Sequence, residues 1–285
     1  MSTFDYFTAF KRNLGFLNRE EQTTIRNARV AIAGLGGTGG AQAHSLARLG
    51  IGAFTLADLD TFELANFNRQ LGATMDTIDK PKVDAISDII ISINPEADIR
   101  KLSNGISEET IEAFLEDVDV VVDSLDFYCF RERFLLYRTA RAKGIWVFTA
   151  PPLGFGYTLL SFDPKGMSFF EYFGFSEDMS EAELAISLVA GIAPMPYMFK
   201  YLHQGGIDVE QHQLPSVGAA PFMIAGVIAT EVANLLTKKY PVLAVPTVQQ
   251  FDALLHRYRR HRYPFGMRGP IQRFKKMLLR RKVPA

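Results

Sequence analysis

The sequence has few residues that build metal sites or covalent cross-links. One cysteine, Cys129, occurs among 285 residues, so a single chain can form neither a disulfide nor a zinc site made of several cysteines. The five histidines are not spaced as metal ligands. These absences exclude a small disulfide-rich domain and a zinc-ribbon domain, and we expect no zinc.

Long apolar runs, internal repeats and low-complexity segments are also absent. The longest uncharged apolar run extends from Leu214 to Thr230, contains Pro221 and is followed by Glu231, which predicts a buried helix and no membrane span. The first residues, MSTFDYFTAFKRN, lack the apolar segment of a signal peptide. We therefore expect a cytoplasmic protein of enzyme size.

Acids are absent from residues 257–285, which hold eleven of the 31 Lys and Arg residues. The rest of the chain is therefore acidic, although the formal net charge is zero. Apolar residues recur at helical spacing within this basic tail: Ile271, Phe274, Met277 and Leu278. The pattern fits either a helix packed on the acidic body or a contact with tRNA, a membrane or another anionic surface.

Strand and helix patterns alternate over the first 150 residues. ARVAIAG, AFTLAD, VDVVVD and IWVFT are apolar runs typical of buried strands, and AQAHSLARLG and CFRERFLLYRTARAKG have helical spacing. GYTLLSFDP predicts an antiparallel addition, APFMIAGVIATEVANLLTKK a helix against the sheet, and VPTVQQFDALLHRY one final strand. We predict an α/β fold: a Rossmann-like, doubly wound, mostly parallel sheet with an antiparallel C-terminal extension.

A glycine run separates the first predicted strand from the first predicted helix. Its candidate nucleotide-binding residues are Gly34, Gly36, Gly37 and Gly39. Glycines allow a tight turn and let phosphates approach the N–H groups of the helix N-terminus. Asp58 ends the second predicted strand, where a carboxylate accepts hydrogen bonds from ribose hydroxyls. The pattern predicts a nucleotide site, and by itself it also fits an NAD-dependent dehydrogenase.

Cationic and amide residues follow Asp58 in the stretch ADLDTFELANFNRQ. Arg69 offers a planar set of donors to phosphate, and Asn66 and Gln70 can reach phosphate oxygens or ribose. Lys82 adds a second cation at the start of a predicted helix. A dehydrogenase leaves the pyrophosphate intact and has little use for these cations, whereas cleavage of ATP between its α- and β-phosphates requires them.

Two acids lie at the end of the fourth predicted strand, in VVVDSLD. Carboxylates at this edge of a parallel sheet are suitable ligands for the Mg²⁺ that accompanies a nucleotide. Asp126 is the predicted magnesium ligand. For Asp123, N-capping of the helix that contains Arg131 is an equal alternative.

The ordered set of motifs resembles the MoeB/ThiF/HesA family, whose adenylation domain is shared with the ubiquitin-activating enzymes. The set runs G-x-G-G-x-G, D-x-D (Asp58 and Asp60), N-x-x-R-Q, a lysine thirteen residues on, and D-x-x-D. The resemblance spans residues 22–161 and 215–236. It is more specific than any one of these motifs alone.

The resemblance also divides the chain. It implies a ThiF-type adenylation domain over residues 1–256, with a nucleotide-binding core at 22–161 and a substrate-side lobe at 162–256. The basic tail at 257–285 would lie outside that domain.

The activity implied by the resemblance is that of a homodimeric, ATP-dependent adenylyltransferase. Such an enzyme activates a carboxylate, commonly the C-terminal glycine of a ubiquitin-like protein, as an acyl-adenylate and releases pyrophosphate. By this likeness Asp58 binds ribose, Arg69 and Lys82 bind phosphates, and Asp126 holds Mg²⁺. The γ-phosphate would meet an arginine from the partner subunit's N-terminal segment, here Arg12, with Arg19 as the second choice.

The sequence departs from the family pattern in three ways. Phe127 stands where family members have asparagine, the two CxxC pairs of many members are missing, and no cysteine follows Cys129. A covalent relay through cysteine is therefore not expected. Three alternatives stay open: a tRNA threonylcarbamoyladenosine dehydratase-like enzyme, an NAD- or FAD-dependent oxidoreductase, and a silent partner in a heterodimeric activating enzyme.

Overall fold

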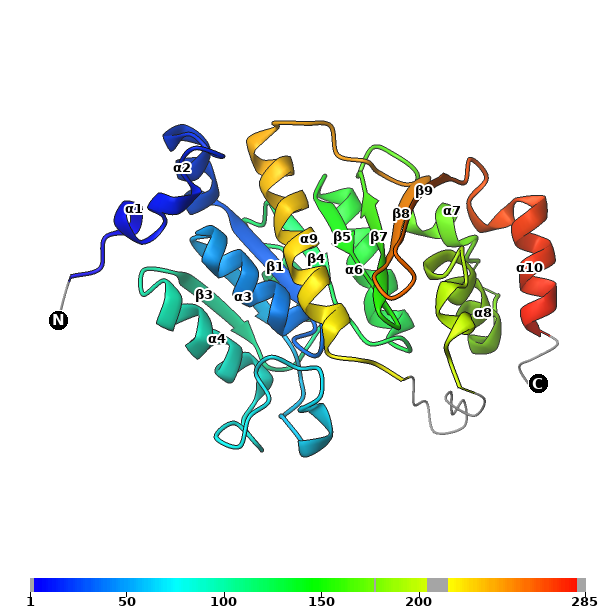
Figure 1. The fold of residues 1–285 in the computed structure, drawn as a ribbon, viewed down its shortest axis with the longest axis horizontal. Coiled ribbons are helices and arrows are strands. Elements are labelled where there is room, and N and C mark those ends of the chain that lie inside the picture. The colour runs from blue at the N-terminus through cyan, green and yellow to red at the C-terminus, as the bar shows by residue number, and fades with distance from the viewer. Residues whose placement is uncertain (1–2, 177, 204–214, 281–285) are drawn as a thin grey trace.

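The computed structural model describes residues 3–176, 178–203 and 215–280, which form a nine-stranded sheet with helices on both faces (Figure 1). The strand order is β3-β2-β1-β4-β5-β7-β8-β9, with β6 paired to β7. The strands are β1 (Arg29–Ala33), β2 (Ala53–Ala57), β3 (Asp98–Leu102), β4 (Val120–Asp123), β5 (Trp146–Thr149), β6 (Pro152–Leu153), β7 (Gly156–Phe162), β8 (Thr247–Asp252) and β9 (Arg257–Arg262).

Helices connect and cover these strands. The α-helices are α1 (Tyr6–Ala9), α2 (Arg19–Asn27), α3 (Gly39–Leu49), α4 (Lys82–Ile93), α5 (Ile111–Phe114), α6 (Phe130–Ala142), α7 (Phe169–Phe173), α8 (Glu181–Ile192), α9 (Ala219–Thr237) and α10 (Pro270–Arg280). The 3₁₀ helices are η1 (Lys11–Asn13), η2 (Leu64–Asn66), η3 (Tyr197–Lys200) and η4 (Gly266–Arg268).

The first five strands form the parallel half of the sheet. β1 lies at its centre and pairs in parallel with both β2 and β4, while β3 and β5 extend the two sides. The chain therefore winds outward in two directions from β1, and the strand order reverses between β1 and β4. Ligands of doubly wound sheets bind at the carboxyl ends of the strands at such a switch point. The predicted Rossmann-like fold is confirmed.

The remaining strands form the antiparallel extension that the sequence predicts. β7 pairs with β5, and β8 pairs with β7. The single final strand predicted over residues 245–258 is wrong, because the chain reverses at residues 253–256 and returns as β9 along β8. Asp252 fixes this turn by accepting a hydrogen bond from Leu255 N at 2.9 Å. The boundary predicted between residues 256 and 257 falls inside this hairpin, so the basic segment begins within the sheet.

Alternation along β1 divides the core into two layers. Val30 and Ile32 face the cluster formed with α3, α4 and α9, while Ala31 and Ala33 face the cluster formed with α5, α6 and α7. The period of two along a strand dictates this division. All of these side chains are fully buried, so the parallel half is covered on both faces.

Helix α9 covers the first of these faces (Figure 1). It is the one helix, among the described residues, that is long and apolar enough to cross a membrane by length and composition. Ile224, Ile228 and Val232 are fully buried against the sheet and α3, in agreement with the buried helix predicted there.

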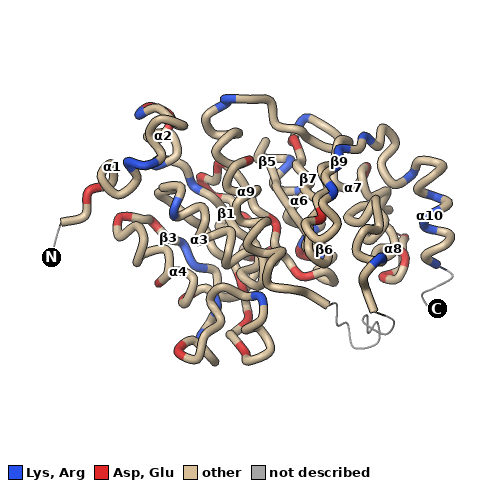
Figure 2. The backbone as a smooth tube through the Cα atoms, in the orientation of Figure 1, with Lys and Arg blue, Asp and Glu red and all other residues tan. Residues whose placement is uncertain are grey.

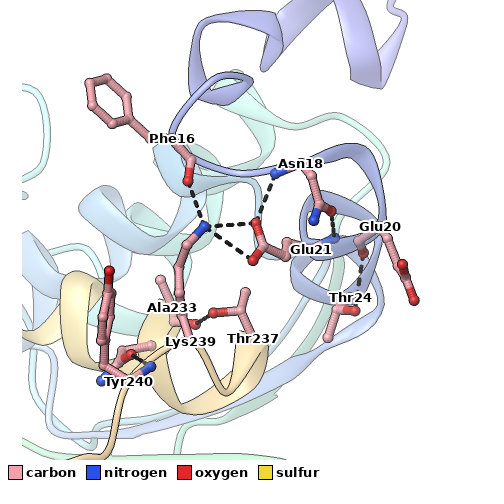
Figure 3. A network of polar contacts seen from close by, with 10 residues as sticks. Phe16, Asn18, Glu20, Glu21, Thr24, Ala233, Thr237, Lys239 and Tyr240 are labelled. Atoms are coloured by element: carbon pink, nitrogen blue, oxygen red, sulfur yellow. Dashed lines mark hydrogen bonds and ion pairs between the residues drawn. The ribbon is translucent and has the colours of Figure 1, made fainter.

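The N-terminal segment is attached to two distant helices. Tyr6 Oη donates to Gly50 O at 2.6 Å, and Asn13 Nδ2 donates to Leu49 O at 3.0 Å, so the segment lies at the end of α3. Lys239, just after α9, donates to Phe16 O at 2.8 Å and to both carboxylate oxygens of Glu21 (Figure 3). The segment and α9 are therefore held together as one unit.

Candidate active site

The glycine loop lies between β1 and α3 at the switch point of the sheet. Gly34 has a φ of +85°, and a Cβ there would lie 2.5 Å from the carbonyl oxygen of Ser124. A Cβ at Gly39 would lie 1.9 Å from the carbonyl oxygen of Gly34. No larger residue fits at either position. Helix α3 begins directly after this loop, and the N-terminus of a helix favours a bound anion.

Asp58 lies at the end of β2, beside this loop. Its carboxylate accepts hydrogen bonds from Leu35 N at 2.6 Å and from Asp60 N at 2.8 Å. Burial raises the pKa of the Asp58 carboxyl, and these two N–H donors act against that shift. The carboxylate is thus fixed next to the glycine turn, where the ribose of a bound nucleotide is expected.

Arg69 and Gln70 pack directly on the glycine loop. A Cβ at Gly37 would lie 3.5 Å from Arg69 Cγ, and one at Gly36 would lie 3.6 Å from Gln70 Nε2. Among the described residues, the Arg69 guanidinium donates only to Ala65 O and to Asn68 Oδ1, both at 2.9 Å and both within its own loop. It can therefore bind phosphate without breaking a core contact.

Gln70 has an unused acceptor at this point. Its Oε1 atom is buried and accepts no hydrogen bond from the described residues. Buried acceptors normally have partners, so a donor from a bound molecule, such as a ribose hydroxyl, fits this position. Asn66 has a local role instead: its Oδ1 accepts from Glu63 N at 3.1 Å in the capping of η2.

Lys82 is buried at the start of α4 and pairs with Asp60. Its Nζ lies 2.8 Å from Asp60 Oδ2, and its N–H donates to Asp60 O at 2.9 Å. Asp60, predicted to bind the nucleotide, therefore holds Lys82 in place. For Lys82 to reach a phosphate, its ammonium group must be shared between that phosphate and Asp60.

Asp123 forms a buried ion pair with Arg133. Its Oδ2 accepts from Arg133 Nε at 3.0 Å and from Tyr137 Oη at 3.1 Å, while its Oδ1 accepts from Leu125 N. The N-cap alternative for Asp123 is therefore wrong, because the N-cap of α6 is Cys129 and has no side-chain cap bond. The Arg133 partner also leaves Asp123 poorly suited to bind a metal.

Arg133 fixes the backbone that carries Asp126. It donates to Leu125 O at 2.7 Å and to Asp126 O at 3.0 Å. The Asp126 carboxylate is exposed and accepts no hydrogen bond from the described residues. Mg²⁺ is commonly held by one or two carboxylates together with substrate phosphates, so this single free carboxylate fits such an ion. No group of three His, Cys, Asp or Glu side chains occurs among the described residues, so a complete protein cage is not formed there.

Ser124 and Gln42 link β4 to α3. The Ser124 hydroxyl hydrogen-bonds with Gln42 Oε1, and Gln42 Nε2 is buried with no acceptor among the described residues. Neither residue belongs to a motif, and Arg133 lies ten positions from its partner Asp123. The sequence therefore carried no signal for these contacts beyond a helix that presents polar residues to a strand end.

The glycine loop, Asp58, Arg69 and the Asp126 loop thus meet at one edge of the sheet. The sequence model of the ThiF family matches residues 10–266. The chain belongs to the ThiF family.

Relatives within and around the ThiF family match smaller parts of the chain. A tRNA threonylcarbamoyladenosine dehydratase of Bacillus subtilis (strain 168) is 39% identical over 123 residues, 43% of this chain and 48% of that protein. A molybdopterin-synthase adenylyltransferase of Escherichia coli (strain K12) is 35% identical over 105 residues, 37% of this chain and 42% of that protein. The chain therefore matches less than half the length of these curated relatives.

A solved structure has a similar fold over most of this chain. E. coli MccB, determined with ATP, has a TM-score of 0.66 and 18% identity, and covers 86% of this chain and 66% of that one. The predicted ThiF membership and the α/β fold are confirmed together.

Phe127 and Cys129 lie just before α6 in this ThiF protein. The ring of Phe127 packs edge-on against Tyr128, with centroids 4.9 Å apart, so an apolar contact stands where asparagine is usual. Burial raises the pKa of the Cys129 thiol. Because the thiolate is the nucleophile, this shift lowers the reactivity of the Cys129 side chain at neutral pH.

Arg12 does not reach the glycine loop of its own ThiF chain. It lies on η1, next to Asn13, which is bonded to the C-terminal end of α3. The glycine loop is at the opposite end of that 11-residue helix, about 16 Å away at 1.5 Å per residue. Arg12 is exposed and has no hydrogen bond or ion pair with the described residues, whereas Arg19 stacks over Phe7 at 4.0 Å.

The buried ion pair gives a stability prediction. We expect Arg133→Met to lower the free energy of unfolding by about 3–5 kcal/mol, because Asp123 is left buried without its cation. The matched control Arg131→Met, two residues earlier on α6 and exposed, should change it little. Urea unfolding followed by circular dichroism measures both.

A double variant separates charge from shape. Asp123→Leu combined with Arg133→Met should be more stable than Arg133→Met alone, since no unpaired charge remains. A double variant less stable than the single one would contradict this account.

Proposed function

We propose that this ThiF protein is an ATP-dependent adenylyltransferase that activates a carboxylate as an acyl-adenylate and releases pyrophosphate. The observation that carries the proposal is the packing of Arg69 and Gln70 on the glycine loop opposite Asp58. A nucleotide with its phosphates over that loop meets a guanidinium, and its ribose meets Asp58. The adenylyltransferase among its relatives, and the structure of MccB with ATP, support the same reading.

The chemistry needs charge stabilisation more than proton transfer. A substrate carboxylate is ionised at neutral pH and attacks the α-phosphorus without a general base, while the bond to the β-phosphate oxygen breaks. Arg69 would neutralise the developing charge on the phosphates, and Lys82 would assist once its ammonium group is shared with Asp60. Mg²⁺, when bound by Asp126 together with the phosphates, would supply further charge neutralisation.

A homodimer is part of the proposal. The outer face of α9 exposes Phe222, Gly226 and Thr230 in one stripe, a surface of apolar and small residues suited to a partner helix. Lys239, just after α9, is bonded to the N-terminal segment (Figure 3). In a dimer formed through α9, the N-terminal segments would therefore lie close to the interface. Arg12, which has no polar partner among the described residues, is therefore a better candidate than Arg19 for the partner subunit's site.

The activated carboxylate belongs to one of two classes. A peptide or ubiquitin-like C-terminus is the first, in keeping with the adenylyltransferase relative. The carboxylate of a modified tRNA base is the second, favoured by the dehydratase relative at 39% identity.

ATP is a cytoplasmic substrate, so we propose that the reaction takes place in the cytoplasm.

Exchange of labelled pyrophosphate into ATP tests the activity. We expect exchange that depends on one member of a panel of C-terminal-glycine proteins, peptides and modified tRNA. Arg69→Ala should lower its rate about 100-fold or more, as loss of a group that stabilises transition-state charge does. Lys82→Met should act in the same direction, and Lys80→Met, which alters an exposed neighbour, should not.

The outcome against the proposal is equally clear. If ATP does not bind and NAD does, the protein is an oxidoreductase. If ATP binds and exchange with an active substrate is unchanged in Arg69→Ala, the residue has no role in the chemistry.

The raised pKa of Asp58 predicts how ATP affinity depends on pH. The carboxylate form accepts from ribose, so its contribution is present above the raised pKa and is lost as the pH falls through it, earlier than for a carboxyl of pKa 3.8. At neutral pH we expect Asp58→Asn to bind ATP about 10- to 100-fold more weakly.

Calorimetric titration at several pH values measures this effect. The ratio of wild-type to Asp58→Asn affinity should shrink as the pH is lowered, and this ratio cancels the titration of the ATP phosphates. A ratio independent of pH would contradict the role of Asp58.

The dimer and Arg12 are tested together by mixing inactive chains. Arg12→Ala and Arg69→Ala chains should each be inactive, and refolding them together should restore about a quarter of the wild-type sites, since half of the dimers are mixed and each has one intact site. If Arg12 acts in its own chain, no activity returns.

Gly226→Arg serves as the control for the dimer interface. A Cβ at Gly226 would meet no atom of the described residues within 4 Å, and the position is exposed, so we expect folding to be retained. Light scattering should then give the mass of one chain, and the restored activity in the mixing experiment should disappear. A dimer that persists in Gly226→Arg would show that α9 is not the interface.

A further inference from the structure

Helix α10 packs on the body of the protein through a face that holds three polar residues and Leu279. Gln272 is buried, Lys275 Nζ donates to Pro194 O at 2.7 Å, and Lys276 Nζ contacts Ser187 Oγ on α8 at 3.3 Å. Burial lowers the pKa of both Lys275 and Lys276. Two ammonium groups are thus partly desolvated in this contact, on a face where an amphipathic helix usually carries mainly apolar residues.

The apolar side of α10 points away from the protein. The exposed fractions along it are 66% for Ile271, 57% for Phe274, 43% for Met277 and 42% for Leu278. At 100° per residue these four side chains lie within an arc of about 120°. Phe265, just before the helix, is 71% exposed. These four helix residues form one continuous stripe, here called the α10 stripe.

Cations border the α10 stripe, and the helix itself contains no acid. Arg273 and Arg280 are exposed at one border of it, and Arg280 also pairs with Glu183 at 3.0 Å. Residues 257–285 contain no acid, and Figure 2 shows Lys and Arg along both β9 and α10. An apolar stripe beside positive charge is complementary to an anionic lipid bilayer, in which negatively charged headgroups cover apolar acyl chains.

We propose that α10 docks this protein on an anionic lipid membrane surface, with the α10 stripe inserted among the acyl chains and Arg273 and Arg280 at the lipid phosphates. The proposal goes beyond the adenylation reaction and does not depend on it. α10 lies at the end of the molecule opposite the N-terminus and packs on α8, away from the glycine loop (Figure 1).

Two other occupants fit the observations less well. Ribonucleic acid is bound by cations and by aromatic rings that stack on bases, and three of the four residues of the α10 stripe are not aromatic. A second copy of α10 would bring Arg273 and Arg280 of both copies together, with no acid on the helix to pair with them. An anionic bilayer satisfies the apolar and the charged parts at once.

Vesicle flotation with the full-length protein tests the proposal. Binding to vesicles of phosphatidylcholine mixed with phosphatidylglycerol should exceed binding to phosphatidylcholine alone at least about tenfold, and should weaken as salt is added. Phe274→Glu should lower binding about tenfold or more. The matched control Phe16→Glu changes an 88% exposed phenylalanine at the other end of the molecule and should bind as the wild type does.

Insertion is measured through tryptophan. The chain has one tryptophan, Trp146, which lies in β5 within the protein body. Brominated lipids should quench the added fluorescence of Phe274→Trp and leave that of the wild-type protein nearly unchanged. Phe274→Glu should retain the circular dichroism spectrum, the mass in solution and the pyrophosphate exchange of the wild type. A failure of vesicle binding would then be distinguishable from a failure of the proposed enzyme activity.

Three results would each overturn the proposal. One is equal, weak binding to both vesicle types. Another is binding that survives Phe274→Glu. The third is a loss of tRNA binding or of the dimer in Phe274→Glu without any vesicle binding by the wild type, which would assign the α10 stripe to RNA or to a second copy.

Discussion

The approach of the glycine loop to the end of β4 is the constraint on which the candidate site depends. Gly34 and Ser124 are so close that the loop has room for backbone alone, and Gly39 is pressed against Gly34 in the same turn. This contact sets where α3 begins and therefore where its N–H groups point. From the other side, Arg133 holds the backbone of Leu125 and Asp126. Phosphates and metal would thus be received by positions fixed through main-chain contacts.

The two cations of the candidate site, Arg69 and Lys82, have different partners in the protein. Lys82 is buried and neutralised by Asp60, while the bonds of Arg69 to the described part of the chain stay within its own loop. A triphosphate bound over the glycine loop would meet Arg69, whose side chain can reorient toward it. It would also meet Lys82, whose ammonium group would be shared between the phosphate and Asp60. The pair with Asp60 avoids a buried unpaired ammonium group, which would be costly.

The sequence predicted the parts of the fold that rest on strong local patterns. Apolar strands that end in glycine or aspartate, and helices with clear spacing between them, were enough for the parallel half and for the position of the glycine loop, Asp58 and Arg69. The hairpin of β8 and β9 was not predicted because the β9 sequence RYRRHR has no alternation of apolar and polar residues. Its strand conformation depends on pairing with β8. The roles of Arg133 and Gln42 escaped because they depend on the rotation of α6 and α3 against the end of β4, which no motif encodes.

The two outermost strands of the sheet carry a further consequence. β9 presents Arg257, Arg259, Arg260 and Arg262 along one edge, and β3 presents Asp98, Arg100 and Lys101 along the other. Open strand edges are templates for unwanted pairing between molecules, and charge along them opposes it. Two sheets meeting through β9 would bring eight guanidinium groups together. Growth of the sheet from one molecule to the next is therefore disfavoured at its basic edge, and association is directed toward surfaces made of helices.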